Sequence, residues 1–130
     1  MNQPQQPPSL NIAIDGNRRK FSPGETLAGR VTWAVEVDPK SAELRLFWYT
    51  SGKGTQNVGI VQRIPFGAPQ PSDGRQFSLV LPQEPYSCSG SLISIIWALE
   101  LILEPHARTE RLEFTMGPNG NEVILAKTSA

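Results

Sequence analysis

The chain is poor in the residues that most often bind metals or form disulfides. Among its 130 residues there is one cysteine, Cys88, and one histidine, His106. An internal disulfide needs two cysteines, and a structural zinc site takes four nitrogen or sulfur ligands. The sequence therefore excludes an intrachain disulfide and predicts no metal site and no cofactor. A single unpaired thiol is also more typical of a reducing compartment than of a secreted protein.

The chain also lacks an excess of charge of either sign. Twelve Lys and Arg residues balance twelve Asp and Glu residues. Domains that bind nucleic acids usually carry a basic excess, so we expect no nucleic-acid partner. The densest basic run is Arg18-Arg19-Lys20, which we interpret as a solvated turn.

No hydrophobic run is long enough to cross a membrane as a helix. The longest apolar stretch, Leu92–Leu103, is interrupted by Ser94 and Glu100, whereas a membrane-spanning helix needs about twenty apolar residues. Residues 1–8 are rich in proline and glutamine and have neither the basic start nor the apolar centre of a signal peptide. We therefore expect a cytoplasmic protein with a disordered leader at residues 1–8.

Proline and glycine are abundant instead. The 12 prolines and 11 glycines favour many short strands joined by turns, because each proline removes an amide donor and breaks a helix interior. The segment Ser22-Pro23-Gly24-Glu25 predicts a type II turn, since proline presets φ at the first central position and glycine supplies a positive φ at the second. The length fits one domain.

Apolar residues alternate with polar ones along most of the chain. The clearest predicted strand is Thr26–Val37. Every second residue from Leu27 through Val31 to Val37 lies on the same face of this strand. Leu92–Leu103 is apolar on both faces and is predicted to be central, with Ile93 and Ile95 among its inward residues. The other predicted strands are Ser9–Ile14, Glu43–Thr50, Asn57–Phe66, Arg75–Leu81, Thr109–Met116 and a short final candidate, Glu122–Ala126.

Seven good strands without a convincing helix predict an all-β, immunoglobulin-like sandwich of two antiparallel sheets with about seven to eight strands. Most of Trp33, Trp48 and Trp97 are expected between the sheets, each with a partner for its indole N–H.

Two segments resemble the arrestin N-terminal-type domain. Each matches part of that family's pattern in order and spacing, and the resemblance as a whole spans roughly residues 9–117. The first is Leu10-Asn11-Ile12-Ala13-Ile14-Asp15 followed by Phe21-Ser22-Pro23-Gly24-Glu25-Thr26-Leu27-Ala28-Gly29-Arg30-Val31; the second is Phe77-Ser78-Leu79-Val80-Leu81-Pro82 followed by Pro85-Tyr86-Ser87-Cys88-Ser89-Gly90.

This resemblance implies a single arrestin-like sandwich at residues 9–117, preceded by the leader at 1–8 and followed by a turn and a short strand or tail at 118–130. It implies an adaptor or scaffold that binds proteins through sheet surfaces, edges and loops. The second sandwich of two-domain arrestins has no counterpart here, and the basic residues that sense receptor phosphates cannot be aligned to this chain. No binding residue is therefore carried over from the family.

The sequence offers no catalytic constellation. His106 lies in a predicted loop with nothing to bring a serine and an acid to it, and no nucleophile-elbow motif is present. The segment Gly52-Lys53-Gly54-Thr55 departs from a phosphate-binding loop, because glycine follows the lysine. Cys88 lies in a predicted loop and is interpreted as an inert thiol. We expect a protein that is not an enzyme.

One predicted strand has aromatic residues on the face that is expected to point away from the core. In Glu43–Thr50, Arg45, Phe47 and Tyr49 have the parity opposite to Leu44 and its inward neighbours. Aromatic residues and arginine are enriched at binding hot spots. Our hypothesis places Arg45, Phe47 and Tyr49 on an outer face that contacts a partner, a second subunit or the leader; alternatively, a loop covers the face or a bulge reverses the parity.

These observations favour a non-catalytic protein–protein interaction module whose partner is unidentified, with an open sheet edge that pairs with an extended peptide as one mode of binding. Self-association as a structural sandwich is the main alternative. A carbohydrate-binding sandwich and a hydrolase are weaker alternatives, because the first needs a planar row of exposed aromatic rings and the second a catalytic pocket around His106.

Overall fold

The computed structural model describes residues 8–54 and 56–125, and in these residues the fold is all-β. The predicted disordered leader covers residues 1–8, and of these only Pro8 belongs to the described part. Ala126, the last residue of the predicted strand Glu122–Ala126, also lies outside it. Two short 3₁₀ turns, η1 (Asp15–Asn17) and η2 (Pro118–Gly120), are present. The strands are β1 (Ser9–Ile14), β2 (Lys20–Phe21), β3 (Thr26–Ala34), β4 (Ser41–Gly52), β5 (Val58–Phe66), β6 (Ser72–Val80), β7 (Cys88–Ser89), β8 (Ile93–Glu104), β9 (Arg108–Met116) and β10 (Val123–Ile124).

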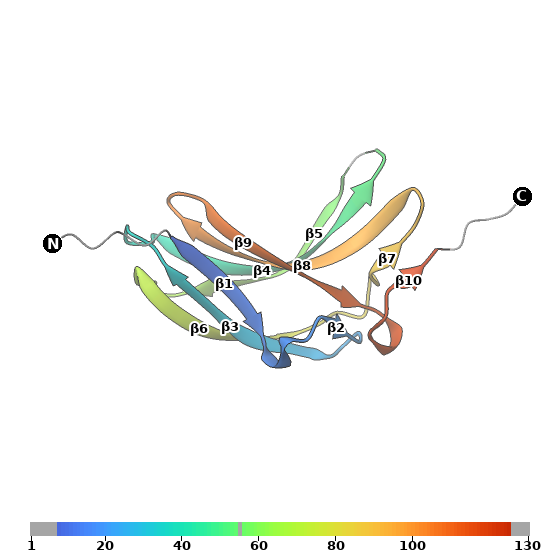
Figure 1. Cartoon of the computed structure of the whole chain (residues 1–130), viewed down its shortest axis with the longest axis horizontal. Helices are drawn as coiled ribbons and strands as arrows, with labels where there is room; N and C mark the ends of the chain where they lie inside the picture. Colours follow the sequence, from blue (N-terminus) through green and yellow to red (C-terminus); the bar gives the residue numbers. More distant parts are fainter. Residues whose placement is uncertain (1–7, 55, 126–130) are drawn as a thin grey trace, which may run out of the picture.

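The strands form two sheets, as predicted. The small sheet has the order β1-β3-β6 and is antiparallel throughout. The large sheet has the order β10-β7-β8-β4-β5. β9 pairs with Trp97–Leu103 on the same edge of β8 as β7, and β2 lies beside β9. The short pairs β2–β9 and β10–β7 are parallel, so the large sheet is mixed and not purely antiparallel. Figure 1 shows the small sheet beneath one part of the large sheet, while β5 and one end of β8 rise away from it.

The core lies between the sheets and follows the alternation of the strands. In β3, Leu27, Val31 and Trp33 are buried while Arg30 is exposed. In β8, the buried face runs from Trp97 through every second residue to Leu103. Alternation of this kind is expected of strands with one face on a core.

The three tryptophans confirm most of the prediction made for them. Trp33 and Trp97 are buried, whereas Trp48 is half-buried. Each buried indole N–H donates to a backbone carbonyl: Trp33 Nε1 to Gln70 O at 2.7 Å and Trp97 Nε1 to Pro85 O at 2.8 Å. These bonds remove the cost of an unpaired buried donor.

The predicted turn at Ser22–Glu25 is present. Gly24 has φ of +77°, and the Glu25 N–H donates to Ser22 O at 3.2 Å. The Ser22 N–H also donates to the Glu25 carboxylate. This bond lowers the pKa of Glu25 below its ordinary value, and a hydrogen bond from Arg18 acts in the same direction.

Two inward residues were predicted wrongly. β3 ends at Ala34, so Val37 lies beyond the strand and is 51% exposed. Ile93 is 41% exposed, because it pairs with Gly52 at the end of β4, where that strand runs into its loop.

The sequence pattern missed the two-residue strands β2 and β7, whereas β10 lies within the predicted final strand Glu122–Ala126. Cys88 belongs to β7 and not to a loop, since it pairs with Ile95 on one side and Val123 on the other. The sheet thereby extends to Ile124. Nowhere in the described chain is there a helix with the length and apolar character that a membrane crossing requires.

Candidate interaction surface

The predicted residues Arg45, Phe47 and Tyr49 lie on the outer face of the large sheet, the side turned away from the β1-β3-β6 sheet. The register of β4, β8 and β9 aligns this face in rows. Arg45 is paired with Glu100, which is paired with Arg111. In the next row Phe47 is paired with Ala98, and Ala98 with Glu113. We call Arg45, Phe47, Tyr49, Glu100, Arg111 and Glu113 the outer-face cluster.

Two aromatic rings and one guanidinium form the centre of the cluster. The rings of Phe47 and Tyr49 stack with their centroids 6.1 Å apart and 29° between their planes. Arg111 Cζ lies 5.0 Å from the Phe47 centroid and 5.1 Å from the Tyr49 centroid. Cations within about 6 Å of a ring centroid are attracted by its quadrupole. The structure thus brings Arg111 from β9 onto the two aromatic residues of β4.

This arrangement corrects one prediction. Phe47 is on the outer face, as its parity requires, but it is 5% exposed and not open to solvent. Arg111 and Tyr49 cover it. The shift in register between Leu46 and Phe47 affects the pairing with β5 and leaves the parity unchanged. Tyr49 and Arg45 are half-buried, so they are the members of the predicted site that a partner reaches first.

Hydrogen bonds and ion pairs hold the polar members of the cluster. Arg45 Nε donates to Glu43 at 2.5 Å, and Arg111 donates to Glu100 at 3.3 Å. The Tyr49 hydroxyl donates to the Glu113 carboxylate. That bond raises the pKa of Tyr49 above its ordinary value; burial and the charge of Glu113 act in the same direction, and Arg111 opposes them.

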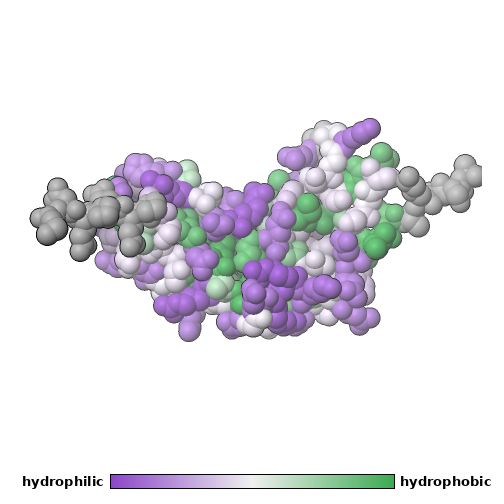
Figure 2. Space-filling model, in the orientation of Figure 1, coloured by the Kyte–Doolittle hydropathy of each residue, from purple (hydrophilic) through white to green (hydrophobic). Residues whose placement is uncertain are grey.

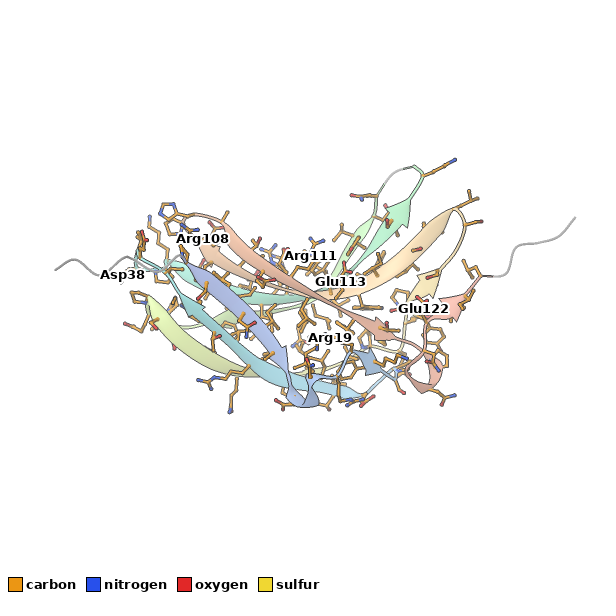
Figure 3. The ribbon with its side chains drawn as sticks, in the orientation of Figure 1. Arg19, Asp38, Arg108, Arg111, Glu113 and Glu122 are labelled. Atoms are coloured by element: carbon orange, nitrogen blue, oxygen red, sulfur yellow. The ribbon has the colours of Figure 1, made fainter. Side chains whose placement is uncertain are left out.

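A cleft of about 220 Å³ lies beside the cluster. In Figure 2 the upper outline of the molecule is hollowed between its two ends, and in Figure 3 Arg111 and Glu113 lie in that part of the sheet. Small-molecule pockets usually enclose about 300–1,000 Å³, so this cleft is suited to one or two side chains of a partner. Its lining consists of Arg45, Phe47, Tyr49, Gln56, Val58, Ile60, Glu100 and Arg111.

A second hollow, of about 300 Å³, surrounds His106 at the end of the sandwich. Its lining includes the acidic residues Glu36 and Glu104 and the positively charged Arg108, but no serine, threonine or cysteine. The hollow therefore does not bring a hydroxyl or thiol nucleophile to His106. Within the residues that the structure describes, no three His, Cys, Asp or Glu side chains are grouped as metal ligands would be.

Sequence reasoning missed Glu100, Arg111 and Glu113. Alternation in β9 shows that Arg111 and Glu113 point away from Phe114 and the core. What alternation cannot show is that β9 lies next to β8 and β8 next to β4, and this adjacency brings the two β9 residues to the aromatic rings.

The fold is that of an all-β sandwich. Among the comparisons with known proteins, only the comparison of structures finds similar proteins. No family model matches the chain, and no curated protein matches its sequence. The crystal structure of Spo0M, a sporulation control protein from Bacillus subtilis, is similar over 85% of this chain, with a TM-score of 0.62 and 14% identity. The match covers 49% of the Spo0M chain, so this chain spans about half of that protein's length.

Two other solved structures have weaker similarity. An alkylpurine DNA glycosylase, AlkC, from Pseudomonas fluorescens covers 85% of this chain and 30% of its own, at 10% identity and a TM-score of 0.44. A β-glucosidase from Listeria innocua covers 92% of this chain and 16% of its own, at 12% identity and a TM-score of 0.45. At these values neither structure supports a conclusion about function.

Proposed function

We propose that this chain is a non-catalytic protein–protein interaction module of arrestin-like fold, an adaptor or scaffold that contacts its partner through the outer face of the large sheet. The observation that carries the proposal is the outer-face cluster beside its cleft. A cytoplasmic location is part of the proposal, supported by the single unpaired thiol of Cys88.

The chemistry of the cluster suits a binding hot spot. Tyrosine and arginine are enriched at such positions, where a desolvated centre is surrounded by contacts that exclude water. Tyr49 and Arg111 are held by Glu113 and Glu100 before any partner arrives. Groups that are already ordered lose less side-chain entropy when they bind, which favours affinity.

The similarity to Spo0M supports the fold part of the proposal. Spo0M is described as a sporulation control protein, and its structure is similar to this chain over 85% of the chain. A regulatory role for a neighbour of this fold is compatible with a module that acts by binding. At 14% identity the similarity supports no particular partner.

The carbohydrate-binding alternative is less favoured by the geometry. Such a surface needs aromatic rings that lie side by side and face the solvent. Here the rings of Phe47 and Tyr49 stack on each other, and Arg111 lies over both. Self-association has a specific structural feature in its favour, an open sheet edge, and is tested together with that edge below.

The proposal is tested by affinity capture from a lysate of the source organism. The variants Tyr49→Ala and Arg111→Ala each remove one accessible member of the cluster. Matched controls are Gln76→Ala and Arg30→Ala, which change exposed residues on the outer face of the small sheet. Truncating a hot-spot residue costs about 2 kcal/mol or more, so a partner is expected to be held about 30-fold more weakly by the cluster variants.

Retention of that partner by both control variants, with unchanged melting temperatures, completes the expected result. If folded Tyr49→Ala and Arg111→Ala capture the same proteins as the native chain in the same amounts, the outer face is not the binding surface.

A further inference from the structure

Among the residues that the structure describes, the strand β5 forms an open edge of the large sheet. It is the last strand in the order of that sheet and pairs with β4 on one side. Three apolar side chains are exposed along it: Val58 at 60%, Ile60 at 43% and Val61 at 44%. An exposed edge strand presents unpaired N–H and C=O groups that are a template for another strand.

The backbone groups that point outward from β5 follow from the alternation of an antiparallel pair. The Thr50 N–H donates to Asn57 O at 2.9 Å, so the backbone N–H and C=O groups of Asn57 point toward β4. Hydrogen-bonded and non-hydrogen-bonded positions alternate along such a pair. Val58 and Ile60, which are paired with Tyr49 and Phe47, therefore point their N–H and C=O groups to the open edge.

One end of β5 is protected against pairing, and the other is not. Beyond the register shift the same alternation places Pro65, paired with Glu43, at an outward position. Proline has no N–H to offer there, and proline, charge and bulges are the usual means of blunting a sheet edge. The part of the strand that has neither the proline nor the register shift is Val58–Ile60, next to the cleft that Val58 and Ile60 also line.

Charge at the border of this segment is unbalanced. Arg63 is paired directly with Arg45 on the outer face, and like charges opposite each other are unfavourable. Arg45 has an ion pair with Glu43, whereas among the described residues Arg63 has none. A carboxylate added beside Arg63 would be attracted to it.

We propose that β5 takes up an extended segment of another protein as an additional antiparallel strand, with apolar residues beside Ile60 and Val58 and an acidic residue beside Arg63. The proposal rests on the proposed function and names the kind of partner. Main-chain hydrogen bonds supply affinity in such strand addition, and alternate side chains supply specificity. A second copy of β5 fits less well, because Val58–Phe66 contains no Asp or Glu to place beside Arg63.

The test uses two blocked synthetic peptides that differ at one position. The first, Thr-Glu-Thr-Val-Thr-Val-Thr, places glutamate beside Arg63 and valines beside the apolar residues in the antiparallel direction. The second has lysine in place of glutamate. Exposed ion pairs contribute little, so the glutamate peptide is expected to bind the native chain about two- to five-fold more tightly by calorimetry. In Arg63→Glu this preference is expected to reverse.

Backbone variants test whether the edge itself binds. Ile60→Pro removes an outward N–H, as Pro65 does naturally, and is expected to abolish binding of both peptides, whereas Ile60→Thr retains it. Val58→Pro repeats the test at the more exposed position in case Ile60→Pro does not fold. With the native chain, peptide binding is expected to slow amide exchange at Val58 and Ile60 more than at Gly59.

Failure of both peptides to bind, or equal binding by folded Ile60→Pro, overturns the proposal. A native dimer that Ile60→Pro converts to a monomer also overturns it, in favour of a second copy on the edge. If the peptides fail while Tyr49→Ala still loses captured partners, the edge proposal falls and the proposed function stands. If Tyr49→Ala loses none while Ile60→Pro abolishes peptide binding, the outer-face proposal falls instead.

Discussion

Tyr49 combines the two properties that a contact residue of this surface needs. Its ring packs against Phe47, and its hydroxyl is fixed by the Glu113 carboxylate. Because Arg111 lies over the same ring, the side chain has few other positions to adopt. A partner that binds at Tyr49 therefore meets an ordered aromatic ring at the border of the cleft.

The bond between Tyr49 and Glu113 predicts a raised phenol pKa. The chain has two tyrosines, so Tyr86→Phe leaves Tyr49 as the single phenol in an alkaline absorbance titration. Its midpoint is expected above the ordinary value, because the bond to Glu113 favours the protonated phenol. Adding Glu113→Gln is expected to lower the midpoint, whereas Glu110→Gln on the same strand is not.

The same bond affects stability in a defined pH range. A pKa that is raised in the folded state stabilises the fold fully below the unfolded pKa of about 10 and loses this contribution as pH rises through the folded value. The chain with Glu113 is thus expected to lose more stability above pH 10 than Glu113→Gln. Identical titration midpoints in the two proteins would show that the bond does not exist in solution.

At the scale of elements, β4 and β5 form a hairpin whose inner side depends on a glycine. The Trp48 indole lies against Gly59, its partner across the pair. A Cβ at Gly59 would overlap the indole ring. The half-buried Trp48 therefore keeps its place because the opposite strand has no side chain at this point.

Gly59→Ala is expected to destabilise the chain by about 1–3 kcal/mol, the usual cost of overpacking. The matched control is Gly67→Ala, where a Cβ meets no heavy atom within 4 Å and stability is expected to stay within about 0.5 kcal/mol of native. Urea unfolding followed by tryptophan fluorescence measures both. Equal stability of Gly59→Ala and Gly67→Ala would mean that Trp48 does not occupy this position.

The sequence predicted the long strands because alternation is a local signal. β1 has the predicted bounds, Ser9–Ile14, and β9 begins one residue before the predicted Thr109. The missed strands β2 and β7 have two residues each, too few to show a period of two. The sequence predicted one part of the candidate site, because parity placed Phe47 and Tyr49 on one face. It did not predict their contact with Arg111, because that contact depends on the order of strands in the sheet.

At the scale of the whole molecule, the two faces of the large sheet differ in what covers them. The small sheet covers one part of the large sheet, and the hollowed outer face lies on the opposite side (Figures 1 and 2). The outer-face cluster and the open edge of β5 meet at Val58 and Ile60, which border the cleft. One partner segment on β5 would therefore lie within reach of Tyr49, so the face and the edge together form one continuous surface.

The most direct test of this account is site-specific photo-crosslinking in living cells of the source organism. A photoreactive phenylalanine analogue replaces Tyr49 in one strain and Gln76, on the outer face of the small sheet, in another. The account predicts a discrete crosslinked protein from position 49 that is absent from position 76. Crosslinks of equal yield to the same protein from both positions, or crosslinks from position 76 alone, would contradict a partner bound at the outer face.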